Sequence, residues 1–144
     1  MNKCYLDSNF LIYFKNESSP YHQQAVKTIS KLVGDYVMLF ISPLVIDEFL
    51  HSFSLELKKG RIKDIYANLK RALQDILSIP DLCLINPPLE KNSQIEVITL
   101  MRKYNLRARD AYHFLIMQAN DIPFFATFDT DFEKVFATKS LSKI

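Results

Sequence analysis

Glycine is scarce in this 144-residue chain, which contains only Gly34 and Gly60. Loops that bind phosphate groups through backbone N–H groups need several glycines close together, as in the G-x-G-x-x-G turn or the P-loop. Two glycines this far apart can form neither motif. The sequence therefore argues against the usual forms of dinucleotide and nucleoside-triphosphate binding.

Cysteines and long apolar segments are also few. Cys4 and Cys83 both lie within apolar runs, where a free cysteine is commonly a small buried hydrophobic residue, and nothing in the sequence calls for a disulfide. Lys3 and Asp7 interrupt the region in which a signal peptide needs a continuous apolar core, and no apolar run approaches the roughly 18 residues of a membrane span. We therefore expect a cytoplasmic protein that does not enter the membrane.

The residues that are present suit a globular protein with a hydrophobic core. Hydrophobic residues make up 49% of the chain and charged residues 24%, which is an ordinary balance for such a protein. A chain of this length usually forms one domain. We expect a single domain over residues 1–144.

The formal net charge of +2 conceals an uneven distribution. Residues 58–109 contain 11 basic and 5 acidic side chains, whereas residues 1–57 contain 4 and 6, and residues 110–144 contain 3 and 5. A basic middle between two acidic ends could attract a polyanion. An evenly solvated surface is the alternative interpretation.

Short apolar, β-prone runs alternate with segments of helical periodicity. We expect strands at residues 3–6, 36–41, 82–85 and 123–127. We expect helices or helical turns at residues 10–14, 21–33, 43–58, 61–77, 108–120 and 131–136, and another helix that follows a turn at 86–88 and reaches 104. This alternation predicts an α/β fold with a central, mostly parallel sheet of four or five short strands and helices on both faces. The runs at 36–41 and 82–85 read as buried strands.

Acidic residues follow the first and last of these strands. Asp7 ends the first strand and Asp129 lies just past the fourth. If these two strands are neighbours, both acids project into the same crevice beyond the carboxyl ends of the strands. Parallel sheets bind their ligands in that place. Asp110 lies in the first turn of a helix. Each acid also has a structural explanation, since Asp7 could cap a helix and Asp110 could favour the positive end of its own helix.

Taken together, the acids indicate a metal site. Two carboxylates about 4 Å apart repel each other by about 4 kcal/mol at an effective dielectric constant of about 20, and a bound cation removes that penalty. Hard oxygen ligands favour Mg²⁺ or Mn²⁺. A structural zinc site needs Cys and His residues at short spacing, which this sequence does not supply.

Four motifs in a fixed order carry a family resemblance. They are Asp-Ser-Asn-Phe-Leu-Ile after the first strand, an acid in the helix after the second, Arg-Asp-Ala-Tyr-His at the start of a late helix, and Ala-Thr-Phe-Asp-Thr-Asp-Phe after the last strand. Over nearly the whole chain, this set resembles the PIN-domain ribonucleases, and most closely the VapC-type toxins of bacterial toxin–antitoxin pairs. The resemblance implies a PIN-like nuclease domain that acts as a metal-dependent endoribonuclease and hydrolyses RNA phosphodiester bonds.

Carried over residue by residue, the resemblance implies an acidic site with polar support. Its catalytic and metal-binding residues are Asp7, Glu48, Asp110 and Asp129, and its supporting residues are Asn9, Thr127 and Asp131. Helical periodicity does not choose between Asp47 and Glu48, and only the resemblance favours Glu48. Asp131 could assist Asp129, although we favour capping of the last helix as its role.

Residues near Asp110 add a histidine and a basic segment. His113 lies three residues after Asp110, on the same helical face, and could touch the site. We interpret it as a partly buried histidine satisfied by its neighbours and not as a ligand or proton shuttle. Lys103, Arg107 and Arg109 lead into Asp110 and are candidates for binding RNA phosphates.

The resemblance also implies a small antitoxin protein that covers or enters the acidic groove, and a homodimer. Other functions stay open at this point. A HAD-like phosphatase also has an aspartate after its first strand, but Asn9 stands where its second acid belongs. A catalytically silent PIN-like module would bind RNA or protein without cleavage, although the four acids argue against it. A metal-independent ribonuclease would use histidines as acid and base.

Overall fold

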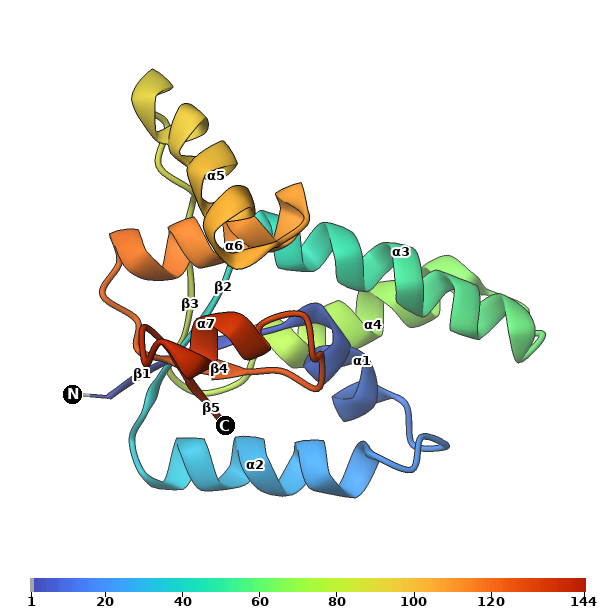
Figure 1. The fold of residues 1–144 in the computed structure, drawn as a ribbon. Coiled ribbons are helices and arrows are strands. Elements are labelled where there is room, and N and C mark those ends of the chain that lie inside the picture. Colours follow the sequence, from blue (N-terminus) through green and yellow to red (C-terminus); the bar gives the residue numbers. More distant parts are fainter. Residues whose placement is uncertain (1) are drawn as a thin grey trace.

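The computed structural model describes residues 2–144. Within them the chain forms one five-stranded sheet with the order β3-β2-β1-β4-β5, and every strand pairing is parallel (Figure 1). The strands are β1 (Lys3–Leu6), β2 (Met38–Ile41), β3 (Leu82–Leu84), β4 (Phe124–Ala126) and β5 (Ser142–Lys143). The helices of these residues are α1 (Ser8–Lys15), α2 (His22–Gly34), α3 (Pro43–Lys59), α4 (Ile65–Leu77), α5 (Lys91–Tyr104), α6 (Ala108–Ala119) and α7 (Glu133–Ala137). The predicted α/β class and parallel sheet are confirmed.

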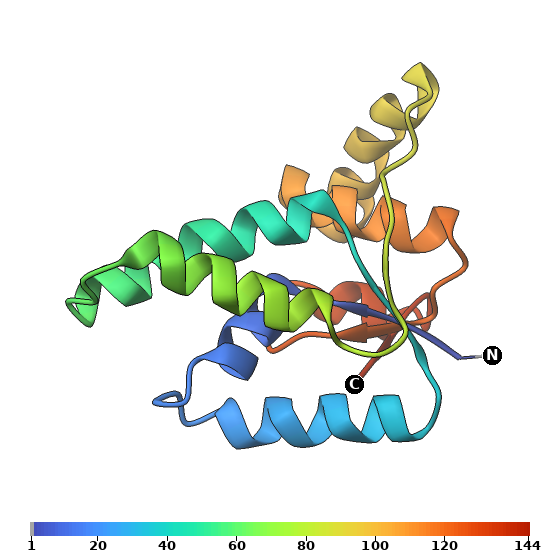
Figure 2. The ribbon, with the colours of Figure 1, turned by 180° about the vertical axis from the view of Figure 1, so that it is seen from behind.

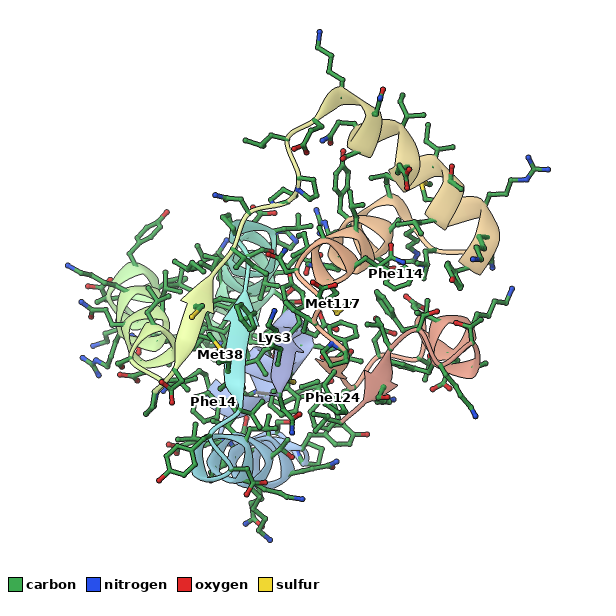
Figure 3. All side chains as sticks on the ribbon, turned by 90° about the vertical axis from the view of Figure 1, so that its left-hand side faces the viewer. Lys3, Phe14, Met38, Phe114, Met117 and Phe124 are labelled. Carbon is green, nitrogen blue, oxygen red and sulfur yellow. The ribbon has the colours of Figure 1, made fainter. Side chains whose placement is uncertain are left out.

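Helices cover both faces of the sheet. Figure 3 shows α2 on one side of the strands and α5 with α6 on the other. Figure 2 shows α3 and α4 packed side by side as an arm that extends away from the sheet. The largest fully buried side chains include Tyr5, Phe49, Phe114 and Phe125, so the core lies where the strands meet these helices.

The order of the strands reverses between β1 and β4. The chain moves outward from β1 to β2 and β3, and then α5 and α6 carry it back to β4 on the other side of β1. Leu6 is in register with Ala126, so the residues that follow these two strands emerge side by side. A reversal of strand order of this kind is where open parallel sheets bind ligands.

Local chemistry explains where several elements begin and end. The Ser42 hydroxyl oxygen accepts a hydrogen bond from the Val45 N–H group at 3.4 Å, and Pro43 occupies the first position of α3. Both were expected at a helix start, because proline has no N–H group to leave unpaired there. At the end of α5, Asn105 adopts the left-handed conformation with φ 53°, which is common at helix ends.

The expectation of a buried third strand is wrong. Within residues 2–144, β3 pairs with β2 alone and forms an edge of the sheet, and Leu84 is 56% exposed. An apolar run does not distinguish a central strand from an edge strand, because strand order depends on the rest of the fold.

Two predicted boundaries also differ from the structure. The helix expected from residue 61 begins at Ile65, because Arg61 has a left-handed φ of 53° and the Asp64 carboxylate caps the helix by accepting from the Ala67 N–H group at 2.9 Å. The strand expected from residue 36 begins at Met38, since Tyr36 also has a left-handed φ, of 55°. Left-handed residues interrupt regular structure, and apolar patterning does not reveal them.

Neither cysteine forms a disulfide, Cys4 being buried and Cys83 half-buried. Among residues 2–144, no helix combines the length and the apolar character needed to cross a membrane.

Candidate metal centre

Asp7 is buried at the carboxyl end of β1, with 8% of its surface exposed. Its Oδ1 atom accepts a hydrogen bond from the Ser8 N–H group at 2.7 Å and its Oδ2 atom accepts from the Thr127 hydroxyl at 2.5 Å. Asp7 is therefore the N-cap residue of α1 and also faces the residue that follows β4. The structural and the functional interpretation of Asp7 are compatible.

The structure separates Glu48 from Asp47. Glu48 points inward from α3, with a side chain only 12% exposed, whereas Asp47 is exposed and lines a hollow between α3 and α4. One ligand atom each from Asp7, Glu48 and His113 lies within 4.8 Å of the other two. Only the resemblance favoured Glu48 in the sequence; in the structure Glu48 lies beside Asp7 and His113, and its role as a ligand stays a prediction.

Asp110 lies half-buried in the first turn of α6, near the other acids. Burial raises the pKa of Asp110 to about 6, with further contributions from the negative charges of Asp131, Asp129 and Asp7. His113 opposes the shift. The charges of all three acids therefore affect the pKa of Asp110. Within residues 2–144, however, Asp110 does not belong to the group of Asp7, Glu48 and His113 whose ligand atoms lie within 4.8 Å of one another.

Asp129 and Asp131 organise the loop after β4 in a way that the sequence did not indicate. The Asp129 Oδ1 atom accepts hydrogen bonds from the Thr130 N–H group at 2.7 Å and the Asp131 N–H group at 3.1 Å. Helix α7 begins only at Glu133 and has no side-chain cap, so the capping role favoured for Asp131 is wrong. The charge of Asp131 acts on Asp110 instead, more strongly than that of Asp129.

Asn9 and Thr127 connect this loop to Asp7. The Asn9 Oδ1 atom accepts from the Phe128 N–H group at 3.2 Å, and its Nδ2 atom donates to the Thr127 hydroxyl oxygen at 3.4 Å. The same oxygen accepts from the Asp129 N–H group at 3.0 Å while its proton goes to Asp7. The two residues expected as polar support are therefore bonded to the acidic site.

A model of the PIN domain family matches residues 4–136. The chain belongs to the PIN domain family. Ribonuclease VapC6 of Methanocaldococcus jannaschii is 33% identical to this PIN domain over 125 residues, which cover 78% of this chain and 82% of that protein.

Solved structures of other proteins share the fold of this PIN domain. VapBC2 from Rickettsia felis, bound to a DNA fragment from their promoter, aligns with a TM-score of 0.70 and 16% identity over 99% of this chain and 97% of that one. VapC20 of Mycobacterium tuberculosis, described as a sarcin-ricin loop cleaving toxin, aligns with a TM-score of 0.62 and 15% identity over 92% of this chain and 94% of that one. At such low identity these likenesses show the fold alone.

The electrostatics of the PIN-domain site suit a cation. Burial raises the pKa of Asp7, and the charge of Glu48 raises it further, while the Thr127 hydrogen bond and the nearby His113 ring act in the opposite direction. The pKa of Asp110 is raised as well, which means that both carboxylates are costly to ionise without a nearby positive charge. Carboxylate oxygens are the ligands of hard divalent cations, so this donor set fits a divalent cation.

The basic residues expected near Asp110 have different surroundings. The Arg109 Nε atom lies 3.2 Å from Glu48 Oε1 and its side chain is 55% exposed. Lys103 is exposed, with its Nζ atom 5.1 Å from the centre of the Tyr104 ring. Arg107 is exposed at the N-cap position of α6, where its side chain makes no capping hydrogen bond.

Sequence reasoning missed Tyr5 and Ser42 at this site. The Tyr5 hydroxyl is 2.6 Å from the Ser42 hydroxyl and 3.0 Å from Nδ1 of His113, and His113 Nε2 is 3.0 Å from Oε2 of Glu48. His113 is buried and bonded through both ring nitrogens, as its interpretation as a satisfied histidine requires. The sequence contained a signal for Tyr5. It precedes Asp7 by two residues in a strand, and residues at that spacing point to the same face. A buried tyrosine hydroxyl also normally needs a hydrogen-bond partner.

Proposed function

We propose that this PIN domain is a metal-dependent endoribonuclease and the toxin of a toxin–antitoxin pair. The observation that carries the proposal is the convergence of buried or half-buried carboxylates at the carboxyl end of β1, from the residue that follows β1 and from α3 and α6. The similarity to a protein named Ribonuclease VapC6 supports RNA as the substrate. Membership of the PIN family argues against the HAD-like phosphatase.

Asp7, Glu48, Asp110 and Asp129 are the residues that would hold Mg²⁺ or Mn²⁺. When bound, such an ion would lower the pKa of water toward neutrality and would screen the negative charge of a phosphodiester. Thr127 and Asn9 hold Asp7 and the loop after β4 in place, and Asp131 adds negative charge beside Asp110. In the hydrolysis, a bond from phosphorus to the oxygen of water would replace the bond to the leaving oxygen, and a proton of that water would end on the leaving oxygen, so no protein nucleophile is needed.

The substrate phosphates need positive charge near this acidic site. Arg109 makes one contact with Glu48, and a guanidinium group has five N–H donors, so it can hold a phosphate as well. Arg107 and Lys103 are exposed nearby in the chain. We assign RNA binding to these three residues.

The test is cleavage of total cellular RNA by purified wild type and Asp7→Asn in Mg²⁺, Mn²⁺ or EDTA, followed by mapping of the ends. Asparagine can still cap α1, so the variant should fold. It should lose cleavage because it lacks the carboxylate of Asp7. Wild-type cleavage should require a divalent ion. Wild type without activity in either metal would support a silent RNA- or protein-binding module, and activity that survives EDTA would support a metal-independent ribonuclease.

A second pair of variants tests the assignment on α3. Glu48→Gln should reduce cleavage strongly, by about 10-fold or more, because ligand and supporting residues of metal sites typically have effects of this size. Asp47→Asn changes the neighbouring acid in the same helix and should cleave as wild type does. Equal loss in both variants would contradict the assignment.

An antitoxin and a second copy of this chain are the proposed protein partners. VapBC2 of Rickettsia felis and FitAcB of Neisseria gonorrhoeae share the fold, the latter with a TM-score of 0.55 and 16% identity, and this likeness supports a small antitoxin as partner. That the antitoxin covers or enters the acidic groove is implied by the family resemblance alone. A homodimer is also proposed, through exposed apolar residues of β3, of α5 and of the segment between them. We call these residues the β3–α5 surface; they are Leu84, Leu89, Ile95 and Ile98. Exposed apolar patches of this kind mark protein interfaces.

A further inference from the structure

Beneath the acidic site, a chain of hydrogen bonds connects the elements that carry its acids. Ser42 caps α3, which carries Glu48. Tyr5 lies in β1, which Asp7 follows, and His113 lies in α6, which carries Asp110. The three linking residues are all buried, with Ser42 and Tyr5 at 0% and His113 at 1% exposure. The chain ends on Glu48, whose Oε2 atom is 3.0 Å from His113 Nε2.

The direction of these hydrogen bonds follows from the groups at each end. The Glu48 carboxylate can only accept when ionised, so His113 Nε2 must carry a proton and donate it. In a neutral ring Nδ1 is then an acceptor, and the Tyr5 hydroxyl is its donor at 3.0 Å. The Tyr5 oxygen in turn accepts from the Ser42 hydroxyl at 2.6 Å. Every member is bonded, and no buried side-chain polar atom within residues 2–144 lacks a partner.

This arrangement determines what His113 can do. Both of its ring nitrogens are used, one by Tyr5 and the other by Glu48, so neither is free to bind a cation while the chain persists. Glu48 is held from two sides, by buried His113 at Oε2 and by half-exposed Arg109 at Oε1. A carboxylate held in this way keeps one orientation, which supporting residues of metal sites commonly provide.

We infer that Tyr5 and His113 are positioning residues of this site, which fix the carboxylate of Glu48 through the Ser42–Tyr5–His113–Glu48 hydrogen-bond chain, and that His113 is not a metal ligand. The inference rests on the proposed function for its catalytic consequence. The presence of a proton on His113 Nε2 does not depend on whether the protein cleaves RNA.

The decisive measurement is the ¹⁵N–¹H correlation spectrum of the histidine rings, recorded on the full chain in EDTA and in saturating Mg²⁺. The His113 signals, assigned by their loss in His113→Gln, should show a proton on Nε2 in both conditions. Loss of that proton when Mg²⁺ is added would make Nε2 a ligand and overturn the inference. Tyr5→Phe should change the His113 nitrogen shifts, because Nδ1 loses its donor.

Calorimetry of Mn²⁺ binding in the absence of RNA tests whether the hydrogen-bond chain affects how tightly the acids bind a cation. Tyr5→Phe and His113→Leu should weaken Mn²⁺ binding by about 10- to 100-fold, as losses of supporting residues do. His113→Gln can still donate an amide N–H to Glu48 and should retain more affinity than His113→Leu. The matched control is Tyr112→Phe, which removes a hydroxyl on the same helix whose partner is Gln94 at 2.8 Å; it should bind Mn²⁺ as wild type does.

RNA cleavage by the same variants separates this inference from the proposed function. In Tyr5→Phe, kcat should fall by about 10- to 100-fold with little change in KM, because the RNA-binding residues are intact. Tyr112→Phe should lower the melting temperature to a similar extent and leave kcat unchanged. If wild type cleaves and the two tyrosine variants behave alike, positioning is wrong and the proposed function stands. If wild type does not cleave, the proposed function fails, and the Mn²⁺ and NMR measurements still decide the role of His113.

Discussion

At the level of single residues, one side chain can serve the fold and the site together. Asp7 caps α1 with one carboxylate oxygen and accepts the Thr127 hydroxyl with the other. It is buried, and its pKa is raised by that burial. Such a group stabilises a helix and still has a reason to bind a cation, because a positive charge offsets the cost of keeping it ionised.

Asp110 gives a prediction about pH. Burial and the charge of Asp131 raise its pKa from 3.8 to about 6 in the folded protein. Between these values the folded state binds more protons than the unfolded state, so the free energy of unfolding should fall as pH rises. In EDTA, the melting temperature of wild type should therefore decrease from pH 4 to pH 7 more than that of Asp110→Asn. Added Mg²⁺ should reduce the loss at pH 7.

The same measurement has a clear negative outcome. If wild type and Asp110→Asn lose stability in parallel as pH rises, Asp110 does not cause the pH dependence. The pKa of Asp110 is then not raised by its surroundings.

At the level of elements, α3 and α6 each bring an acid to the end of β1. Ser42 and Pro43 fix the first turn of α3, and Glu48 then falls on the face toward Asp7. Asp47 is one residue away and faces α4. The start of α6 likewise sets the direction of Asp110 and leaves Arg107 exposed before it.

Arg107 at the start of α6 is the cleanest test of RNA binding, because Arg109 also contacts Glu48. Arg107→Ala, made in the Asp7→Asn background so that RNA stays intact, should weaken RNA binding. It should also reduce the slope of log K against log salt by about one, the contribution of one phosphate contact. Lys91→Ala, which removes an exposed charge at the start of α5, is the control. An unchanged slope in Arg107→Ala would argue against phosphate contact.

At the level of the whole molecule, the acids of the site and the β3–α5 surface lie on different elements. The acids lie near the carboxyl end of β1, whereas the β3–α5 surface combines Leu84 of the edge strand with Ile95 and Ile98 of α5, which are 66% and 62% exposed.

Introducing charge into the β3–α5 surface should break the proposed homodimer. Light scattering coupled to size exclusion should find wild type as a dimer and the double variant Ile95→Glu/Ile98→Glu as a monomer with unchanged secondary structure. Tyr66→Ser, at an 83% exposed position on α4, should remain dimeric. A monomeric wild type at the same concentration would refute the proposal.

Much of this molecule follows from the sequence. The alternation of apolar runs and helical periodicity predicted a parallel α/β fold, because each pattern depends on neighbouring residues alone, and Ser42 and Asn105 marked helix ends by their own chemistry. The acids after two strands indicated a site, since parallel strands end at one edge. Exposed β3 and the left-handed Arg61 were not predicted, because edge position and turn geometry depend on distant parts of the chain.

Other features were decided only by the tertiary structure. The choice of Glu48 over Asp47 needed the direction of α3 relative to β1, because both residues flank the same apolar face. The role of Asp131 needed the position of α7, which begins too late for it to cap. The link from Ser42 through Tyr5 to His113 joins residues 37 and 108 positions apart, and only folding brings them together. Residue types alone determined that this chain has acids suited to a cation; packing decided which of them meet.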